Sequence, residues 1–599
     1  MKKTHTNKFE FRNFIIENLK EKKILIFLFF LCSILLGIVE SSVVGSLKPI
    51  VDVVQDPGQI KIYNNQINSY LNVDIGTKNF KKIFFLFFVI LFLLSGFLNL
   101  LCIYLSNKVR EYFHYSWKLK LLKNYLNKDI SFFNKFQSGD LIQKILVHTR
   151  EGASFFYETA IILRESFIAI TIYILLLFIS IKYTIYVSIF AAIIFFITWL
   201  VGKLIIVKQT KFRNKSQEQV YSLTEMILRG IKIIKSFNKE NFFLDFFINK
   251  NRIYKKKEIL TTSLIPVPAI ILRNIVFIVI IIAAYIVSNI PIENYNLQNI
   301  STFIIFIGGF YKINNSFGSI NNAILSSSRL YPSLQIISQE IQKDENQKNY
   351  EEETDQKFDL NSFKKNLEFN KISYKYPGNN NSTLDNLNFK FIKSSTNLIV
   401  GPSGSGKSTL IDIILGFKNA SGEIRVDDQK NVNIKNKKFI NYSYLSQNSL
   451  LFPGTIRENI VFFEKLIDQE YYNKIVNICK IKDILEKFSS DYNLENNESY
   501  KLSEGQKQRI CLARTLYSNK PIIILDEALS NIEISLEKQI IDDVLKLVKE
   551  ENKTLIVVSH SLKNYENVDQ INVINNGKIE QKGTHDELKN LEGFYKKNF

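Results

Sequence analysis

Long apolar runs alternate with polar stretches in the first half of the chain. A helix needs about 20 apolar residues to cross a bilayer. Six runs of this length predict six membrane helices: 24–46, 83–104, 160–181, 184–207, 264–287 and 300–325. The sixth run is the least apolar, because Lys312, Asn314 and Asn315 interrupt it. Buried helices of a large soluble protein are the alternative, and runs such as IFFLFFVILFLL disfavour it.

Basic residues gather in two of the segments between these runs. Segments 107–158 and 208–260 are rich in Lys and Arg, whereas 288–299 contains neither. Because positively charged loops stay in the cytoplasm, both segments and both termini are predicted to be cytoplasmic, at the bacterial inner membrane. The spacing of Leu223, Ile227, Ile231 and Ile234 is helical, so we expect helices that continue beyond the membrane. An amphipathic helix on the membrane surface is the alternative.

The character of the chain changes at 342–357. This segment, QKDENQKNYEEETDQK, is charged and poor in apolar residues, which is typical of a linker. It separates a predicted membrane domain, 1–341, from a predicted soluble domain, 358–599, in which short strand patterns begin near Leu367.

The net charge of +20 does not indicate a nucleic-acid partner, because much of the Lys excess borders apolar runs and no nucleic-acid recognition motif is present. The four cysteines form no CxxC pair, which disfavours a disulfide or zinc framework.

The stretch NLIVGPSGSGKSTLIDIIL contains the strongest chemical signal in the chain. A short apolar strand leads into G-x-x-x-x-G-K-S and then into a helix, the setting in which backbone N–H groups and a helix N-terminus surround phosphate oxygens. Lys407 is expected to reach the terminal phosphates and Ser408 to bind Mg²⁺. A flexible Gly/Ser linker is the alternative. The predicted phosphate-binding residues are Gly401, Ser403, Gly404, Ser405, Gly406, Lys407, Ser408 and Thr409.

Other candidate residues follow apolar strands or lie in turns. PIIILDEALS ends a strand in Asp526, predicted to hold the metal through water, and Glu527, predicted to polarise the attacking water. KTLIVVSH ends in His560, a candidate donor to the γ-phosphate, although a lone histidine at a strand end is more often structural. Gln447 also follows a predicted strand, and its amide suits the sensing of metal and water. Tyr376 offers a ring for a base to stack on; an aromatic side chain in a turn is the alternative.

In this order, these motifs resemble the ABC (ATP-binding cassette) transporters, specifically half-transporters of the exporter type. Tyr376 matches the aromatic loop, Gly401 to Thr409 Walker A, Gln447 the Q-loop, and Asp526 with Glu527 the end of Walker B. His560 matches the switch histidine. The resemblance implies a membrane all-α domain of six transmembrane helices, followed by an α/β P-loop NTPase (ABC cassette) domain with a helical subdomain. It also implies ATP and Mg²⁺ as cofactors, with Ser408, Gln447 and Asp526 around the metal.

The resemblance gives a role to LSEGQ, residues 502–506. In the family this signature closes over ATP held by the Walker A of a second cassette. Ser503, Gly505 and Gln506 are therefore implied to contact ATP on a partner, either a second copy or a paralogous half-transporter. Because Glu527 and His560 are both present, we expect hydrolysis at both sites of a homodimer.

Three stretches depart from the family pattern. Glu504 stands where the family has a small glycine, and the D-loop is SNIE, residues 530–533, where the family usually has SALD. NLENNESYK precedes the signature without the V-G-E-x-G pattern.

Polar residues inside predicted spans suggest what is transported, since they are costly there. Arg164 and Glu165 are expected to pair with each other. Arg273 and Lys312 suggest a cavity for an anionic head group, and Glu40 is a further candidate. Segment 47–82, long enough for an external helix, and SSRLYPSLQII look similar to the subgroup that moves lipid-linked oligosaccharides. We therefore expect an ATP-driven flippase or exporter of an amphiphile among membrane lipids; a multidrug or peptide exporter and an ATP-gated channel or regulator are the alternatives.

Overall fold

The computed structural model divides into two compact units, Met1–Lys128 with Phe132–Gln347, and Asp129–Ser131 with Lys348–Phe599. We call them the helical unit and the α/β unit. The structure describes residues 2–71, 76–128, 130–133, 136, 138–182, 184–185, 189, 196, 212–213, 215–217, 219–264, 266–267, 270–271, 274, 278, 281, 297–351, 356–359, 364–376, 381–427, 429–433, 437–440, 442–488, 501–527, 529–559, 562 and 564–599. His560 and Arg273 lie outside these residues, as does most of the predicted spans 184–207 and 264–287.

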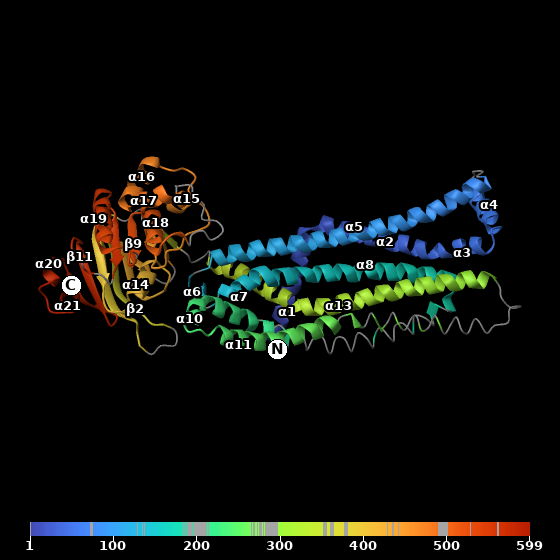
Figure 1. Ribbon diagram of the computed structural model, residues 1–599, viewed down its shortest axis with the longest axis horizontal. Helices are drawn as coiled ribbons and strands as arrows, with labels where there is room; N and C mark the ends of the chain where they lie inside the picture. The colour runs from blue at the N-terminus through green and yellow to red at the C-terminus, as the bar shows by residue number, and fades with distance from the viewer. Residues whose placement is uncertain are drawn as a thin grey trace. The chain divides into compact units, whose positions relative to one another are not determined.

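The helical unit is built from long helices that Figure 1 shows running alongside one another. Their described members are α1 (Lys2–Glu21), α2 (Lys23–Gly45), α3 (Leu47–Gln55), α4 (Gln59–Leu71), α5 (Thr77–Leu126), α7 (Ser138–Gln143), α8 (Thr149–Ile179), α10 (Ile231–Ser236), α11 (Glu240–Leu264) and α13 (Leu297–Glu351). A short π-helix, Lys144–His148, joins α7 to α8, and α6 (Ile130–Phe133) precedes α7.

Three helical stretches of the described chain are long and apolar enough to cross a membrane: Lys23–Gln55, Thr77–Leu126 and Ser138–Ile179. They contain the first three predicted spans, apart from the final residues of the third. The sixth run, 300–325, lies in α13, which is helical but is not among the three because polar residues interrupt it. α13 continues as far as Glu351, so most of the predicted linker 342–357 is helical.

Segment 47–82, whose length allows an external helix, contains α3, α4 and the start of α5. The side chain of Asp56 accepts a hydrogen bond from the Gly58 N–H at 2.8 Å in the turn between α3 and α4. The Tyr63 hydroxyl of α4 donates to Asp52 of α3 at 2.7 Å. These two contacts fold α4 back against α3.

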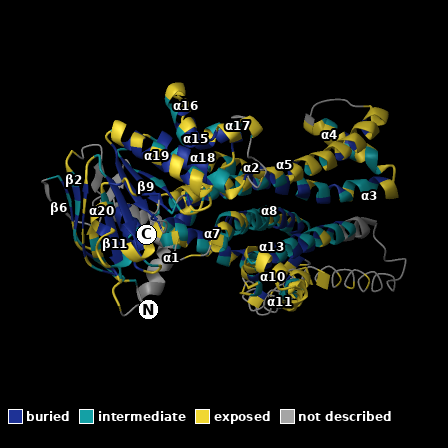
Figure 2. Ribbon diagram, turned by 60° about the vertical axis from the view of Figure 1, so that its left-hand side comes forward, coloured by how far each residue is buried: buried dark blue, intermediate teal, exposed yellow. Residues whose placement is uncertain are grey.

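The helical unit has a continuous interior because apolar faces of α2, α5, α8 and α13 pack together. A second cluster, around the fully buried Phe113 and Trp117, joins α1, α5, α8 and α13. The Trp117 indole N–H donates to the side chain of Asn18 at 2.8 Å, which satisfies the polar atom of this buried ring. Many large apolar side chains of α5 remain exposed along its length, as expected of a helix that faces lipid (Figure 2).

The α/β unit contains a six-stranded sheet in the order β12-β11-β4-β10-β9-β8. β4 (Thr396–Val400), β9 (Ile522–Asp526) and β10 (Thr554–Val558) are buried at every position, the pattern of central parallel strands covered on both faces. β8 (Tyr442–Leu445) and β11 (Gln570–Asn575) extend the parallel pairing, and β12 (Lys578–Gly583) is antiparallel. A parallel sheet brings the carboxyl ends of β4, β8, β9 and β10 to one edge.

Two smaller sheets and eight helices complete the described part of this unit (Figure 1). β3-β2-β5-β6 form an antiparallel sheet, and β1 pairs with β7. The remaining strands are β1 (Gln356–Asp359), β2 (Asn366–Tyr374), β3 (Leu384–Ile392), β5 (Ser421–Val426), β6 (Gln429–Asn433) and β7 (Lys437–Ile440). The helices are α14 (Lys407–Ile414), α15 (Ile456–Val461), α16 (Gln469–Ile478), α17 (Lys482–Phe488), α18 (Glu504–Tyr517), α19 (Ile534–Glu550), α20 (His585–Leu588) and α21 (Phe594–Asn598).

Candidate nucleotide site

The loop between β4 and α14 is shaped by glycines that no other residue replaces without strain. Gly401 and Gly406 have φ of 153° and 103°, in the left-handed region. A Cβ on Gly401 would lie 2.0 Å from the Ile574 carbonyl oxygen, and one on Gly406 would lie 2.5 Å from Leu384 Cδ2. The loop is therefore pressed against β11 and β3, and its backbone turns where the sequence predicted a phosphate cradle.

Lys407 is the first residue of α14, and its side chain is buried beneath this loop. Its Nζ donates to the carbonyl oxygens of Gly401 and Pro402 at 2.9 and 3.0 Å. Burial lowers the pKa of Lys407, while Glu527 and Asp526 act in the opposite direction by attracting its positive charge. The ammonium group thus contacts the loop and is attracted by the carboxylates at the end of β9.

The environment of Ser405 also indicates that the loop can bind a phosphate ligand. The Ser405 hydroxyl oxygen is buried and has no hydrogen-bond partner, whereas buried polar atoms in native proteins are generally satisfied. Ser403, Gly404 and Ser408 are exposed beside it, and no atom would lie within 4 Å of a Cβ on Gly404. A phosphate oxygen is the kind of partner that Ser405 lacks.

Asp526 and Glu527 occupy different environments at the end of β9. Asp526 is buried, which raises the pKa of its carboxyl group, and it accepts a hydrogen bond from the Tyr444 hydroxyl at 3.2 Å. Glu527 has a left-handed φ of 49°, and its N–H donates to the Val558 carbonyl oxygen of β10 at 2.9 Å. The first residue is held inside the sheet edge, and the second turns out of the strand.

Gln447 and Glu527 meet across the sheet edge. The Gln447 Nε2 donates to Glu527 Oε2 at 2.8 Å, although the residues are 80 positions apart in the chain. β8 and β9 are neighbouring parallel strands, which brings the residues after their carboxyl ends together. The sequence suggested both residues separately and did not predict this contact. It also missed Tyr444 of β8, whose hydroxyl reaches Asp526 because β8 pairs with β9.

Tyr376 lies beside α14. Its hydroxyl is 3.1 Å from the Thr409 hydroxyl and accepts a hydrogen bond from Lys418 at 2.6 Å. The Lys418 ammonium also lies over the Tyr376 ring, 4.5 Å from its centroid. Burial raises the pKa of Tyr376, but the hydrogen bonds from Lys418 and Thr409 outweigh it, so that the net direction is downward. Sequence reasoning missed Lys418, for which no local motif exists.

LSEGQ begins a helix. The Ser503 hydroxyl accepts from the Gln506 N–H at 3.3 Å, and the Gln506 side chain accepts from the Ser503 N–H at 2.8 Å. This reciprocal capping box starts α18 and orients its N-terminal N–H groups. The Glu504 side chain is half exposed and lies 3.4 Å from the Lys507 ammonium. Its carboxylate is therefore partnered on the helix surface.

The predicted metal ligands are Ser408, Gln447 and Asp526. The described part of the chain contains no group of three or more His, Cys, Asp or Glu side chains able to hold a metal ion. Ser408, Gln447 and Asp526 offer one hydroxyl, one amide and one carboxylate, so Mg²⁺ at this site would take further oxygen ligands from nucleotide phosphates. His560, the predicted γ-phosphate donor, lies outside the described residues; the N–H of the preceding Ser559 donates to the Ile399 carbonyl oxygen at 3.3 Å, which places the end of β10 beside β4.

Comparison with known proteins agrees with this geometry. The ABC transporter family model matches residues 384–530, and the model of the ABC transporter transmembrane region matches residues 23–313. The chain belongs to the ABC transporters. A transmembrane region followed by one cassette is the order of an exporter-type half-transporter. The cassette match contains the phosphate loop, Gln447, LSEGQ, Asp526 and Glu527; Tyr376 and His560 lie outside it.

Two named relatives match about four-fifths of this ABC transporter, and a third matches a shorter part of it. The ATP-dependent lipid A-core flippase of Wigglesworthia glossinidia brevipalpis is 29% identical over 488 residues, 79% of this chain and 81% of that protein. The flippase of the same name from Haemophilus influenzae is 28% identical over 492 residues, 80% of each chain. The Mesentericin-Y105 transport/processing ATP-binding protein MesD of Leuconostoc mesenteroides is 38% identical over 227 residues, 37% of this chain and 31% of that protein.

Among the ion pairs of the helical unit in this ABC transporter, two involve polar residues that lie inside the predicted spans. Arg164 and Glu165 pair at 2.8 Å, as the sequence predicted, and the Ser316 hydroxyl of α13 donates to Glu165 at 2.9 Å. Lys312 of α13 pairs with the buried Glu40 of α2 at 2.9 Å. The sequence suggested that Lys312 binds an anionic head group. The structure corrects this interpretation, because Lys312 already pairs with the carboxylate of Glu40.

Lys312→Met is expected to lower the free energy of unfolding by about 2 kcal/mol, since Glu40 would stay buried without its cation. The thermal unfolding midpoint of the detergent-solubilised protein measures this loss. The double variant Glu40→Gln/Lys312→Met should recover most of it, because both charges are then removed. A single variant as stable as the unaltered protein would contradict the importance of the pair.

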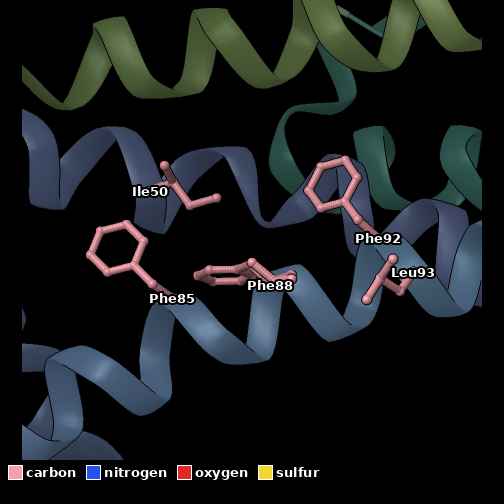
Figure 3. A pocket seen from close by; sticks show the side chains of 6 residues that line it. Ile50, Phe85, Phe88, Phe92 and Leu93 are labelled. Carbon is pink, nitrogen blue, oxygen red and sulfur yellow. The ribbon is translucent and has the colours of Figure 1, made fainter.

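An apolar groove of about 450 Å³ lies between α3 and α5 of the helical unit. Figure 3 shows the side chains converging between the two helices. Its lining residues are Ile50, Phe85, Phe88, Val89, Phe92 and Leu93. Every lining side chain is hydrocarbon, so this surface suits an acyl chain.

Proposed function

We propose that this protein is an ATP-driven exporter or flippase of an amphiphile that works as a dimer by alternating access. The observation that carries the proposal is the 2.8 Å hydrogen bond from Gln447 to Glu527 beside the Lys407 loop, in a chain whose other unit has helices able to span a membrane. This arrangement combines a base, its orienting amide and a phosphate cradle. The combination is suited to hydrolysis of a nucleoside triphosphate.

Within the proposed site, each residue of this chain has a separate task. The loop N–H groups, Ser405 and Lys407 bind the phosphates of ATP, and Ser408, Asp526 and Gln447 would hold Mg²⁺. Mg²⁺, when bound, offsets negative charge on the β- and γ-phosphates. Glu527 accepts the proton of the attacking water, and Gln447 holds its carboxylate in position. His560 donates to the γ-phosphate, and the Tyr376 ring contacts the base.

The proposed dimer gives LSEGQ its function. The capped N-terminus of α18 presents N–H groups that are suited to an anion, and Ser503, Gly505 and Gln506 approach ATP held by a partner chain. The partner is a second copy or a paralogous half-transporter. Six membrane helices, with the α/β unit and both termini in the cytoplasm at the inner membrane, complete the proposal.

An amphiphile is the substrate best supported. The relatives named lipid A-core flippases match about four-fifths of this chain, more than either unit contains alone, whereas the MesD match spans 37%. The apolar groove between α3 and α5 offers space for a hydrocarbon tail. These observations favour a lipid or lipid-linked oligosaccharide over a peptide.

The proposal is tested by reconstituting the purified protein in vesicles and measuring ATP hydrolysis with lipid A-type glycolipid, polyprenyl-linked oligosaccharide, a hydrophobic drug and an apolar peptide. We expect the glycolipids to stimulate hydrolysis and to change leaflet only while ATP is consumed. Stimulation by peptide alone would favour a peptide exporter. Ion flux that persists without sustained hydrolysis would favour a gated channel.

A further inference from the structure

The start of the signature helix contacts the segment after Glu527 at two points. A Cβ on Gly505 would lie only 2.8 Å from the Asn531 carbonyl oxygen, so the glycine permits the close approach of the two backbones. One turn further along α18, Gln508 Oε1 accepts a hydrogen bond from the Asn531 N–H at 3.1 Å. Both polar groups of the Asn531 peptide backbone therefore face α18. Asn531 lies four residues after Glu527 in the chain.

Gln508 is an unfavourable residue for packing alone. Its side chain is almost completely buried, with 1% of the residue exposed, and its amide nitrogen Nε2 has no hydrogen-bond partner. A buried donor without a partner destabilises a protein, and an apolar side chain of similar volume would avoid this cost. The hydrogen bond that Oε1 accepts from the Asn531 N–H is therefore the favourable interaction that an apolar side chain could not provide.

We propose that Gln508 is a positioning residue that ties the start of α18 to residues 529–533, so that LSEGQ and Glu527 of one chain move together. The proposal rests on the proposed dimer, in which LSEGQ serves the partner's ATP and Glu527 serves the ATP of its own chain. A rigid link between them transmits closure at one ATP site to the other ATP site. Such a link produces cooperativity between the sites.

The first test measures the link itself. In Gln508→Met, which conserves volume and removes the acceptor, hydrogen exchange of the Asn531 amide in the full-length protein should accelerate about tenfold, the loss expected for one buried hydrogen bond. Burial raises the pKa of the carboxyl group in Gln508→Glu and keeps it neutral, so this variant retains an acceptor oxygen without burying a charge and should exchange like the unaltered protein. Gln539→Met makes the same chemical change at an exposed position of α19 and is the matched control.

The second test measures the consequence. In Gln508→Met, the Hill coefficient of ATP hydrolysis should fall toward about 1, the value of independent sites, and kcat should fall more than KM rises. Gln508→Glu and Gln539→Met should keep the cooperativity of the unaltered protein. A loss of cooperativity in Gln508→Met without a change in unfolding temperature separates positioning from general destabilisation.

Two outcomes would overturn the inference. One is unchanged exchange and cooperativity in Gln508→Met; the other is an equal loss in Gln508→Met and Gln508→Glu, which would show that the acceptor oxygen is not responsible. Either result would contradict the link between Gln508 and Asn531. If hydrolysis in the same protein still requires Glu527, the proposed function is unaffected. Hydrolysis that does not require Glu527 would instead overturn the proposed function, and the exchange measurement would still decide whether Gln508 holds Asn531.

Discussion

Glu527→Gln is expected to abolish ATP hydrolysis while ATP binding persists. The carboxylate lies beyond the buried end of β9 and is held by Gln447, so it is positioned to accept a proton from water. An amide has nearly the same size but cannot accept that proton. Loss of a general base typically slows a reaction by 10²–10⁴-fold, so turnover should fall at least about a hundredfold.

Phosphate release by the reconstituted protein measures the rate, and binding of a fluorescent ATP analogue measures affinity. The affinity of Glu527→Gln should stay within about twofold of the unaltered value, because the loop and Lys407 remain in place. Glu550→Gln, at the exposed end of α19, is the matched control and should hydrolyse ATP normally. Hydrolysis that continues unchanged in Glu527→Gln would remove Glu527 from the catalytic role.

Lys407→Met is expected to weaken ATP binding itself, in contrast to Glu527→Gln. The buried ammonium donates hydrogen bonds to the carbonyl oxygens of Gly401 and Pro402, which hold it at the phosphate loop. A hydrogen bond to a charged group contributes about 1.5–3 kcal/mol, so affinity should fall by roughly a hundredfold. Hydrolysis at low ATP concentration should fall by a similar factor.

Titration with the same fluorescent analogue measures this loss. Lys578→Met removes a cation from an exposed position of β12 and should bind ATP normally. A melting temperature close to that of the unaltered protein would show that the loss does not arise from unfolding. If Lys407→Met binds ATP as tightly as the control, the loop does not bind phosphate through this lysine.

Local sequence patterns predicted those parts of the molecule whose structure is set by residues close together in the sequence. The apolar runs of α2, α5 and α8 are long enough to appear in the sequence, and the phosphate loop has a fixed spacing between a strand and a helix. The sixth run was harder to interpret, because α13 pairs Lys312 with the buried Glu40 of α2 and buries Ser316 against Glu165 of α8. Their polarity lowers the apolar content of a helix that packs inside the unit.

Contacts between distant residues were not predictable from these patterns. Tyr376 meets Thr409 and Lys418 only because the fold brings the end of the β2 segment beside α14. Gln447 meets Glu527 only because β8 pairs with β9. In segment 47–82 the turn at Asp56 separates the short helices α3 and α4, and the Tyr63–Asp52 hydrogen bond holds the second helix against the first.

By itself, the sequence determined the family, the order of membrane and nucleotide-binding regions, and the residue types around the phosphates. Periodicity and fixed motif spacing carry this information, because each depends on chain neighbours a few residues apart. The tertiary structure alone decided which of those residues act on one another: Gln447 on Glu527, Glu40 on Lys312 and Gln508 on Asn531. Such pairs arise when strand order and helix packing bring distant segments within hydrogen-bonding reach, and no local pattern along the chain records that approach.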